Sequence, residues 1–256
     1  MITALPVLAA RLAGRALPIL CYHRVVPAPP EGTRLNIHVT CADLARQLRQ
    51  LRRRRMMTIT FADLLSERPL PKRPVILSFD DGYRDNHEYL LPLLEEHDAR
   101  AVVFALGDRD LRFNRWDSET GEPEAALMTD AELRACAASG RVEIGSHGLA
   151  HRHLTQLDET ALARELTASK AGLEAVVGKP VHAFAYPYGE WGPRERDAVA
   201  RAGYAVGVAT DRGLPIEQDR YAVARRIMFS ATTPFGFYKK TSNWYPRYRR
   251  LLGRPG

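Results

Sequence analysis

Short apolar runs alternate with longer amphipathic stretches along most of the chain. The apolar runs have the length and composition of buried strands, and they occupy residues 18–23, 74–79, 101–106, 141–146, 183–188, 204–209 and 223–229. Strands that alternate with helical segments indicate a parallel sheet with crossover helices. The pattern therefore predicts an α/β fold.

Several of the intervening segments show helical spacing. Two apolar stripes are formed by Leu44, Leu48 and Leu51 and by Leu162, Leu166, Leu173 and Val176. In a third segment, Thr129 and Glu132 have the spacing of a capping box, and Gly140 is expected to end the helix. Residues 107–128 form the longest irregular stretch, and a loop of that length in a compact domain is usually functional or mobile.

The length and composition of the chain fit one domain. A chain of 256 residues with 45% hydrophobic content can bury a single sizeable core. We therefore predict one domain over 1–256, with an amphipathic lead-in over 1–16 and a basic, aromatic tail over 238–256. The three cysteines are odd in number and lack C-x-x-C spacing, so they indicate neither a disulfide framework nor a thiolate zinc site.

The formal net charge of +7 favours an acidic partner without identifying it. The stretch "LRQLRRRR" carries no interleaved aromatic residue, so we interpret it as a solvated helix face and expect no nucleic-acid partner. The tail over 238–256 mixes aromatic and cationic residues. This mixture suits peripheral attachment to an anionic membrane, although a helix packed on the domain explains it equally well.

The amino-terminal segment is apolar but does not have the pattern of a signal peptide. It lacks a basic start, and Arg11 and Arg15 interrupt the apolar run. The cysteine usage fits a reducing compartment. We therefore expect a cytoplasmic protein, with attachment to the cytoplasmic face of a membrane left open.

Two adjacent carboxylates end one of the predicted strands. In "LSFDDG", Asp80 and Asp81 follow an apolar run and precede Gly82. Asp-Gly is common in simple turns, but the carboxyl ends of parallel strands are also where α/β sheets and barrels place their sites. One carboxylate could bind a metal while its neighbour acts as a base.

Two histidines follow the next strand but one. In "SHGLAHRH", His147 and His151 are four residues apart and can lie on one side of a helical or turn-like segment. Two imidazoles and one carboxylate would make a three-ligand site with open positions, which is typical of catalytic metals. His153 lies off that shared side.

An aromatic stretch, "FAYPYGEWG", spans 184–192. It could be a rigid turn with core aromatics, or a wall for a sugar ring with a backbone N–H directed at an oxyanion.

In order and in strand-end placement, "SFDDG", "SHGLAH" and "FAYPYG" resemble the motifs of the polysaccharide deacetylases of the NodB homology group, carbohydrate esterase family 4. The resemblance covers roughly residues 17–229. It implies a distorted (β/α)7-8 barrel and a divalent metal, with Zn²⁺ ahead of Co²⁺, Ni²⁺ or Fe²⁺.

Carried over to this sequence, the resemblance assigns Asp81, His147 and His151 as metal ligands and Asp80 as the general base. The implied sugar contacts are Tyr186, Pro187, Tyr188, Trp116 and Trp191. The implied activity is removal of acetyl groups from N-acetylated amino sugars of a bacterial cell-surface glycan. Membrane attachment through the tail would instead favour a lipid-linked or lipopolysaccharide-core sugar. An O-acetyl esterase and a catalytically inactive glycan-binding protein are the alternatives.

The sequence departs from the common family pattern at two positions. No histidine follows His182, where most members carry the catalytic acid, and Ala185 replaces an arginine that holds the base. "CYHRV" and "FAYPYG" are similar to the poly-β-1,6-N-acetylglucosamine deacetylase branch, whose barrel is circularly permuted. That similarity implies His23 as the acid and Arg226 as the residue that holds the base, with its neighbour Arg225 as the alternative.

Overall fold

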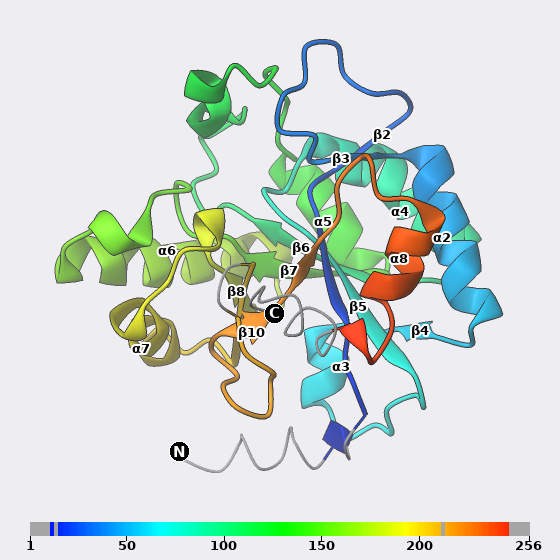
Figure 1. Ribbon diagram of the computed structural model, residues 1–256. Coiled ribbons are helices and arrows are strands. Elements are labelled where there is room, and N and C mark those ends of the chain that lie inside the picture. Colours follow the sequence, from blue (N-terminus) through cyan, green and yellow to red (C-terminus); the bar gives the residue numbers. More distant parts are fainter. Residues whose placement is uncertain (1–10, 13–14, 211–212, 246–256) are drawn as a thin grey trace.

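Parallel strands form a nearly closed barrel in the computed structural model, which describes residues 11–12, 15–210 and 213–245 (Figure 1). The strand order is β10-β9-β8-β7-β6-β5-β1-β11, and the short strand β4 pairs with β5. The bounds are β1 Ile19–Tyr22, β4 Met57–Thr58, β5 Pro74–Phe79, β6 Ala101–Ala105, β7 Val142–Ser146, β8 Ala183–Ala185, β9 Val206–Ala209, β10 Val223–Ala224 and β11 Arg226–Ile227. The predicted single-domain α/β barrel is confirmed.

The barrel closes at a residue where one predicted strand divides into two. Within the run 223–229, β10 pairs with β9, whereas β11 pairs with β1. Arg225 lies between them: its backbone N–H donates to the Ala209 carbonyl at 2.8 Å, and the Met228 N–H donates to the Cys21 carbonyl at 2.8 Å. The backbone therefore transfers its hydrogen bonds from β9 to β1, which places the first strand beside the last.

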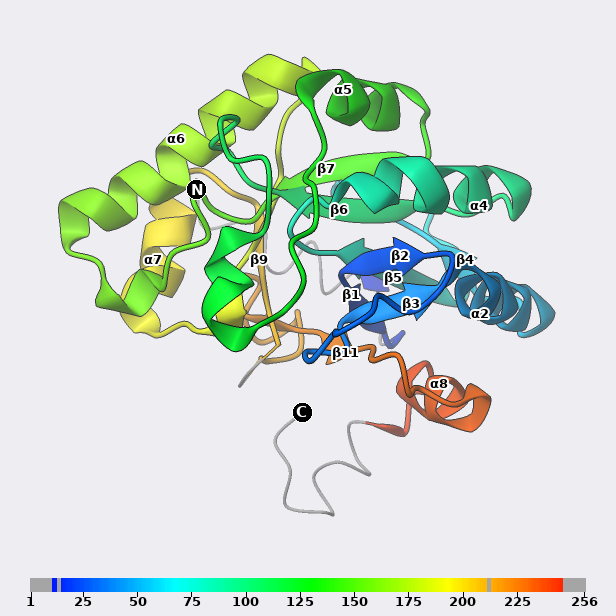
Figure 2. The same ribbon diagram turned by 90° about the horizontal axis from the view of Figure 1, so that it is seen from above.

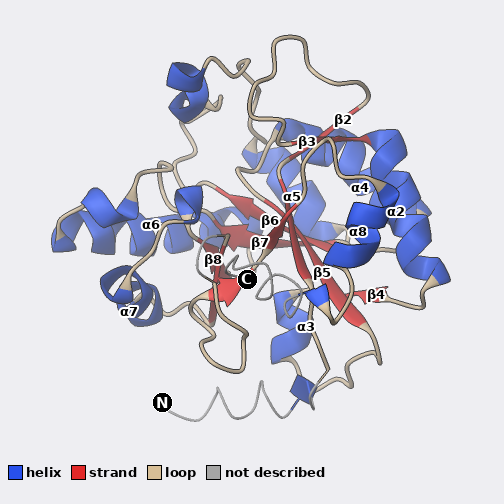
Figure 3. Ribbon diagram, in the orientation of Figure 1, coloured by secondary structure: helices blue, strands red, loops and turns tan. Residues whose placement is uncertain are grey.

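Helices surround the barrel, as seen from above in Figure 2 and by element type in Figure 3. The α-helices are α2 Cys41–Arg53, α3 Phe61–Leu65, α4 Leu91–Glu96, α5 Asp130–Ala138, α6 Glu159–Val177, α7 Pro193–Arg201 and α8 Pro234–Lys240. Short helices of other types are η1 Asn86–Leu90, η2 Arg115–Thr120, η3 Leu154–Gln156 and η4 Pro187–Gly189.

The predicted helix signals are confirmed. Leu44, Leu48 and Leu51 are buried on α2, and the side chains of Thr129 and Glu132 form the expected capping box at the start of α5. Apolar spacing and capping chemistry therefore located these helices correctly.

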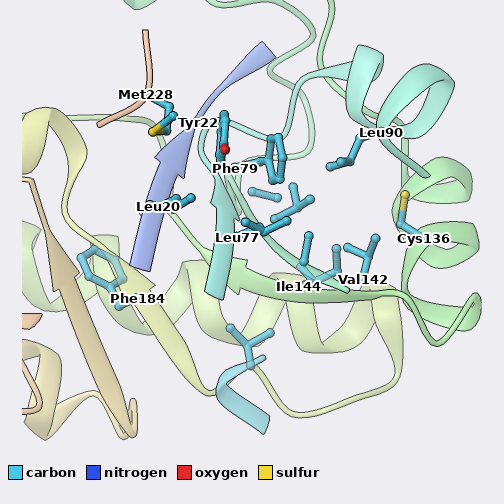
Figure 4. Close-up of a cluster of buried hydrophobic side chains, with 14 of the residues drawn as sticks. Leu20, Tyr22, Leu77, Phe79, Leu90, Cys136, Val142, Ile144, Phe184 and Met228 are labelled. Carbon is cyan, nitrogen blue, oxygen red and sulfur yellow. The ribbon is translucent and has the colours of Figure 1, made fainter. Parts of the chain in front are cut away.

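The main core lies between the sheet and the outer helices (Figure 4). Tyr22 of β1 pairs in register with Phe79 of β5, and their rings stack with centroids 4.9 Å apart. The Tyr22 hydroxyl is satisfied by Gln47 of α2, to which it donates at 2.7 Å. Because β1 and β5 end together, the residues that follow them emerge at the same edge of the barrel.

The structure contains a small sheet that the sequence patterns did not predict. β2 (Arg24–Val26) pairs with β3 (His38–Thr40), just beyond the end of β1. Asp85 anchors β2, since it accepts hydrogen bonds from the Arg24 side chain and the Val25 backbone. Three-residue strands are too short to give a readable alternation, so their prediction depends on such tertiary contacts.

Most of the predicted lead-in over 1–16, and the part of the predicted tail from 246 onward, lie outside the described residues. Within the part of the chain that the structure describes, no helix combines the length and apolar character needed to cross a membrane.

Candidate active site and metal centre

The chemically active side chains gather at the carboxyl ends of the strands. His23 follows β1, Asp80 and Asp81 follow β5, and His147 follows β7. All four line one cavity of about 210 Å³. Parallel barrels place their sites at this end because the loops that leave the strands converge there.

Asp81, His147 and His151 form the predicted three-residue cluster. The Asp81 Oδ1 atom lies 3.3 Å from Nε2 of His147 and 3.3 Å from Nε2 of His151. All three residues are buried, and their ligand atoms lie within 4.8 Å of one another. Three electron-pair donors that converge in a buried position suit a divalent cation.

The surroundings of the cluster favour its ligand role. The His147 Nδ1 atom lies 2.8 Å from the Ala185 carbonyl oxygen, which directs the Nε2 lone pair toward Asp81. Burial lowers the pKa of His151, so its ring is held neutral. Burial raises the pKa of Asp81, but contacts with His147 and His151 outweigh it and hold that pKa well below its usual value. Burial also lowers the pKa of His147, but the carboxylates of Asp80 and Asp81 outweigh burial and raise it. Metals bind the neutral imidazole and the ionised carboxylate, so metal binding would release any proton that His147 holds.

Three side chains of the site are held by unusual backbone conformations. Asp81, His151 and Tyr188 have φ values of 71°, 54° and 59°. Left-handed backbone costs non-glycine residues roughly 1–3 kcal/mol each and tends to persist at functional sites. The loop that carries His151 is not helical; Glu165 stabilises it by accepting the backbone N–H groups of Leu149 and Ala150.

Arg225 holds Asp80 in place, so the prediction that Arg226 does so was wrong and the alternative, Arg225, is correct. The two terminal nitrogens of Arg225 donate to Oδ1 and Oδ2 of Asp80 at 2.6 and 2.7 Å, and both side chains are buried. Arg226 instead donates to the Lys240 carbonyl and lies against the ring of Tyr245. Neighbouring residues of a strand face opposite sides of the sheet, so only one of the two arginines can reach the barrel interior.

The electrostatics of this pair keep Asp80 ionised. Burial raises the pKa of the Asp80 carboxyl, but the Arg225 guanidinium outweighs burial and holds the pKa below its usual value. The bidentate contact leaves Asp80 as a buried, oriented carboxylate beside the metal ligands, which are the properties required of a general base.

His23 lies next to Asp80, in the same cavity as the predicted ligands. A His23 ring nitrogen, the Cys21 sulfur and an Asp80 oxygen lie within 4.8 Å of one another, and the Cys21 thiol is 3.4 Å from Asp80 Oδ2. This second cluster suits a cation poorly, because Arg225 already engages both Asp80 oxygens and brings its own positive charge. His23 is therefore better placed for proton transfer than for metal binding.

Aromatic side chains form part of the cavity wall. Trp116 stacks on His151 with ring centroids 4.5 Å apart, and Tyr188 contacts the same ring edge-on at 4.6 Å. Both residues line the cavity. The loop over 107–128, which the sequence marked as irregular, thus contributes to the site.

The remaining predicted sugar contacts are placed differently. Tyr186 lines the cavity but is buried, and its hydroxyl donates to the Tyr221 carbonyl at 2.7 Å. Pro187 and Trp191 are not among the described residues that line the cavity, and Trp191 packs near Tyr186. The motif therefore provides one exposed ring, that of Tyr188, whereas Tyr186 stabilises the fold.

Several wall residues were not predicted from the sequence. They are Leu35, Ile37, Asp117, Thr210, Ile227 and Phe229. Asp117 is a neighbour of Trp116, and burial together with the Asp81 charge raises its pKa to about 6. A raised pKa in a cavity is a signal of function that only the folded structure provides.

A parallel barrel with a three-ligand metal site and a separate buried carboxylate at its strand ends is typical of metal-dependent hydrolases. The sequence places the chain more narrowly, because residues 67–207, more than half of its length, match the family model for polysaccharide deacetylase. The chain belongs to the polysaccharide deacetylase family.

Individual relatives agree with this assignment. The Bacillus subtilis (strain 168) protein YxkH, which bears a polysaccharide deacetylase name, is 24% identical over 214 residues, covering 82% of this chain and 70% of its own. A de-N-acetylase from Aggregatibacter actinomycetemcomitans has a TM-score of 0.74 at 19% identity, covering 88% and 99% of the two chains. The Streptococcus pyogenes deacetylase PplD has a TM-score of 0.73 at 22% identity, covering 88% and 98%. These structures share the fold of the chain.

Proposed function

We propose that this protein is a metal-dependent N-deacetylase that acts on an N-acetylated amino sugar of a glycan. One observation carries the proposal: Asp80, His23 and the Asp81/His147/His151 cluster line a single cavity. A base, an acid and a metal site are the three elements of metal-assisted amide hydrolysis. Because the cluster offers two nitrogens and one oxygen, Zn²⁺ is the proposed metal.

Asp80 is the proposed base. When bound, a divalent metal makes water a stronger acid and polarises the acetyl carbonyl. Asp80 takes a proton from the water while the oxygen of the water attacks the carbonyl carbon. Arg225 holds the carboxylate in place through both oxygens, so that no reorientation is needed during the reaction.

His23 is the proposed acid. The C–N bond can break only if the departing nitrogen receives a proton, since an amide anion is a very poor leaving group. His23 lines the cavity beside Asp80 and would donate that proton, which releases acetate and the free amino sugar. The backbone N–H of Tyr188 is the proposed further donor to the tetrahedral oxyanion.

The substrate class is inferred from the family and from the cavity wall. Trp116 and Tyr188 present rings of the kind that pack against sugar faces. An acid carried by the first strand supports placement near the poly-β-1,6-N-acetylglucosamine deacetylase branch, and the fold shared with the Aggregatibacter de-N-acetylase is consistent with it. An N-acetylhexosamine in a cell-surface or lipid-linked glycan is therefore the proposed substrate.

The test combines metal analysis with acetate release from N-acetylglucosamine oligomers. His23→Ala should retain bound metal and lose about 10²–10⁴-fold in turnover, which is the usual contribution of general acid catalysis. His147→Ala should lose the metal as well as the activity. His182→Ala is the matched control and should behave as wild type, because that histidine does not line the cavity.

Other outcomes point to other functions. Full activity of His23→Ala would reject its role as the acid. Acetate release from O-acetylated glycans alone would identify an esterase. If no substrate releases acetate after metal reloading, the proposal fails, and glycan binding by the metal-loaded protein would then support the catalytically inactive alternative.

A further inference from the structure

Exposed aromatic side chains are concentrated in one short segment. Of the seven large hydrophobic residues that are exposed in the described part of the chain, four lie between residues 229 and 244. These are Phe229, Phe235, Tyr238 and Trp244, with exposed fractions of 44%, 65%, 42% and 41%. Exposed apolar groups that gather in this way mark an interaction surface.

Cations accompany these rings. Lys239 lies 5.2 Å from the ring centroid of Phe235, Lys240 lies 5.7 Å from that of Phe229, and Arg54, which caps the end of α2, lies 4.4 Å from that of Tyr238. The segment 229–245 contains no aspartate or glutamate. We call Phe229, Phe235, Tyr238 and these three cations the α8 face.

The positive charge continues from the α8 face onto α2. The Gln50 side chain donates to the Pro234 carbonyl, and Arg54 donates to Thr241, so the two helices are in direct contact. Arg49, Arg52 and Arg53, in the last two turns of α2, are exposed as well. The aromatic residues therefore adjoin a broad cationic surface.

The α8 face begins at the opening of the active-site cavity. Phe229 belongs both to the face and to the cavity wall. Lys240 donates to the carbonyl of Ile227, another wall residue, which fixes the end of α8 against the same edge. Anything that binds the α8 face will therefore lie next to the cavity.

We propose that the α8 face binds the surface of an anionic lipid bilayer and holds the cavity against it. Aromatic rings suit the boundary between lipid headgroups and acyl chains, and neighbouring cations are attracted to acidic headgroups. Nucleic acids and soluble anionic polymers offer the charge without an apolar layer, which would leave Phe235 exposed. Together with the proposed function, this placement assigns an N-acetylated amino sugar carried on a membrane lipid as the substrate.

The binding test uses flotation of the metal-loaded full chain with vesicles. One set contains phosphatidylcholine alone, and the other contains equal parts of phosphatidylcholine and phosphatidylglycerol. We expect wild type to float with the acidic vesicles and to remain largely unbound with the neutral ones. Lys239→Gln should weaken partitioning about fivefold, and Phe235→Ser about tenfold.

The matched controls lie elsewhere on the surface. Arg134→Gln removes an exposed cation from α5, and Leu214→Ser removes an exposed hydrophobic residue near β10. Both should bind as wild type does. Equal binding of Phe235→Ser and wild type, or no preference for acidic vesicles, would overturn the proposal, as would binding to a DNA duplex that matches binding to acidic vesicles.

A separate measurement distinguishes the membrane proposal from the proposed function. Phe235 and Lys239 do not line the cavity, so their variants should release acetate from a soluble N-acetylglucosamine oligomer at the wild-type rate. If flotation succeeds and no substrate is deacetylated, the proposed function fails and the membrane surface stands. If the substrate is deacetylated but the protein does not float with the vesicles, the membrane proposal fails and the proposed function stands.

Discussion

Glu143 provides a test of the structure that is independent of catalysis. It lies near the start of β7, whereas the active site lies beyond the end of that strand. Its Oε2 atom accepts the Ala62 N–H at 2.9 Å, but its Oε1 atom is buried without a hydrogen-bond partner. Burial raises the pKa of this carboxyl from 4.5 to about 7.

The raised pKa predicts a stability that depends on pH. The unfolded chain loses the proton near pH 4.5, whereas the folded chain holds it until about pH 7. Stability from the protonated form is therefore complete below pH 4.5 and is lost as the pH rises to 7. A pKa of about 7 in place of 4.5 corresponds to about 3 kcal/mol of stability. Under about 1 kcal/mol of this is lost by pH 5, and nearly all of it is lost by pH 8.

Glu143→Gln removes the ionisation and keeps the shape and the acceptor for Ala62. Wild type loses stability from Glu143 as the pH rises, whereas the variant does not. The free energy of unfolding of the variant minus that of wild type should therefore be about 2 kcal/mol larger at pH 8 than at pH 5. Urea unfolding of the metal-free protein, followed by circular dichroism at both pH values, measures it. Glu96→Gln is the control, because that carboxyl is largely exposed. An equal effect of Glu143→Gln at both pH values would show that Glu143 titrates normally and would refute the reasoning.

Three further predictions concern the active site. Arg225→Lys should lower kcat about 10–100-fold because it loses a bidentate charged contact with Asp80. Arg226→Lys is the control and should change kcat little. Equal effects of the two substitutions would contradict the assignment of Arg225. Cys21→Ala should lower kcat about fivefold. Cys21→Ser keeps a donor to Asp80 and should be closer to wild type. Identical kcat values for Cys21→Ala and wild type would show that the thiol does not position Asp80. Trp116→Ala should raise KM for an N-acetylglucosamine oligomer about tenfold. Trp191→Ala should not, because Trp116 lines the cavity and Trp191 does not. A larger rise in KM for Trp191→Ala than for Trp116→Ala would place the sugar elsewhere.

The sequence predicted those parts of the fold that depend on local pattern. The run 74–79 became β5 without any change in its bounds, because an uninterrupted apolar run suits a strand buried on both faces. Thr129 and Glu132 located the start of α5 because capping uses residues three apart in the chain. Neither inference needed knowledge of distant contacts.

The residues that the sequence could not place depend on closure and on loops. Arg225 and Arg226 are chemically identical neighbours, and only the change of partner from β9 to β1 decides which one faces Asp80. Leu35 reaches the cavity on an irregular segment and Asp117 on the short helix η2, and no apolar periodicity specifies the course of either. The aromatic motif suggested that Tyr186 contacts sugar, although its hydroxyl is used within the fold.

His23 shows how strand register can carry a chemical role to a distant part of the chain. Tyr22 pairs with Phe79, and the Asp80 N–H donates to the Tyr22 carbonyl at 2.9 Å, so the ladder continues to the last residue before His23. A slip of one residue in β1 would turn every side chain of the strand to the opposite face and remove the imidazole from Asp80. Because β1 also pairs with β11, Arg225 reaches Asp80 from the closing strands as His23 lies beside it. The position of the proposed acid therefore depends on which strands are neighbours in the barrel, and a histidine near the start of the chain can fill it as well as one near the end.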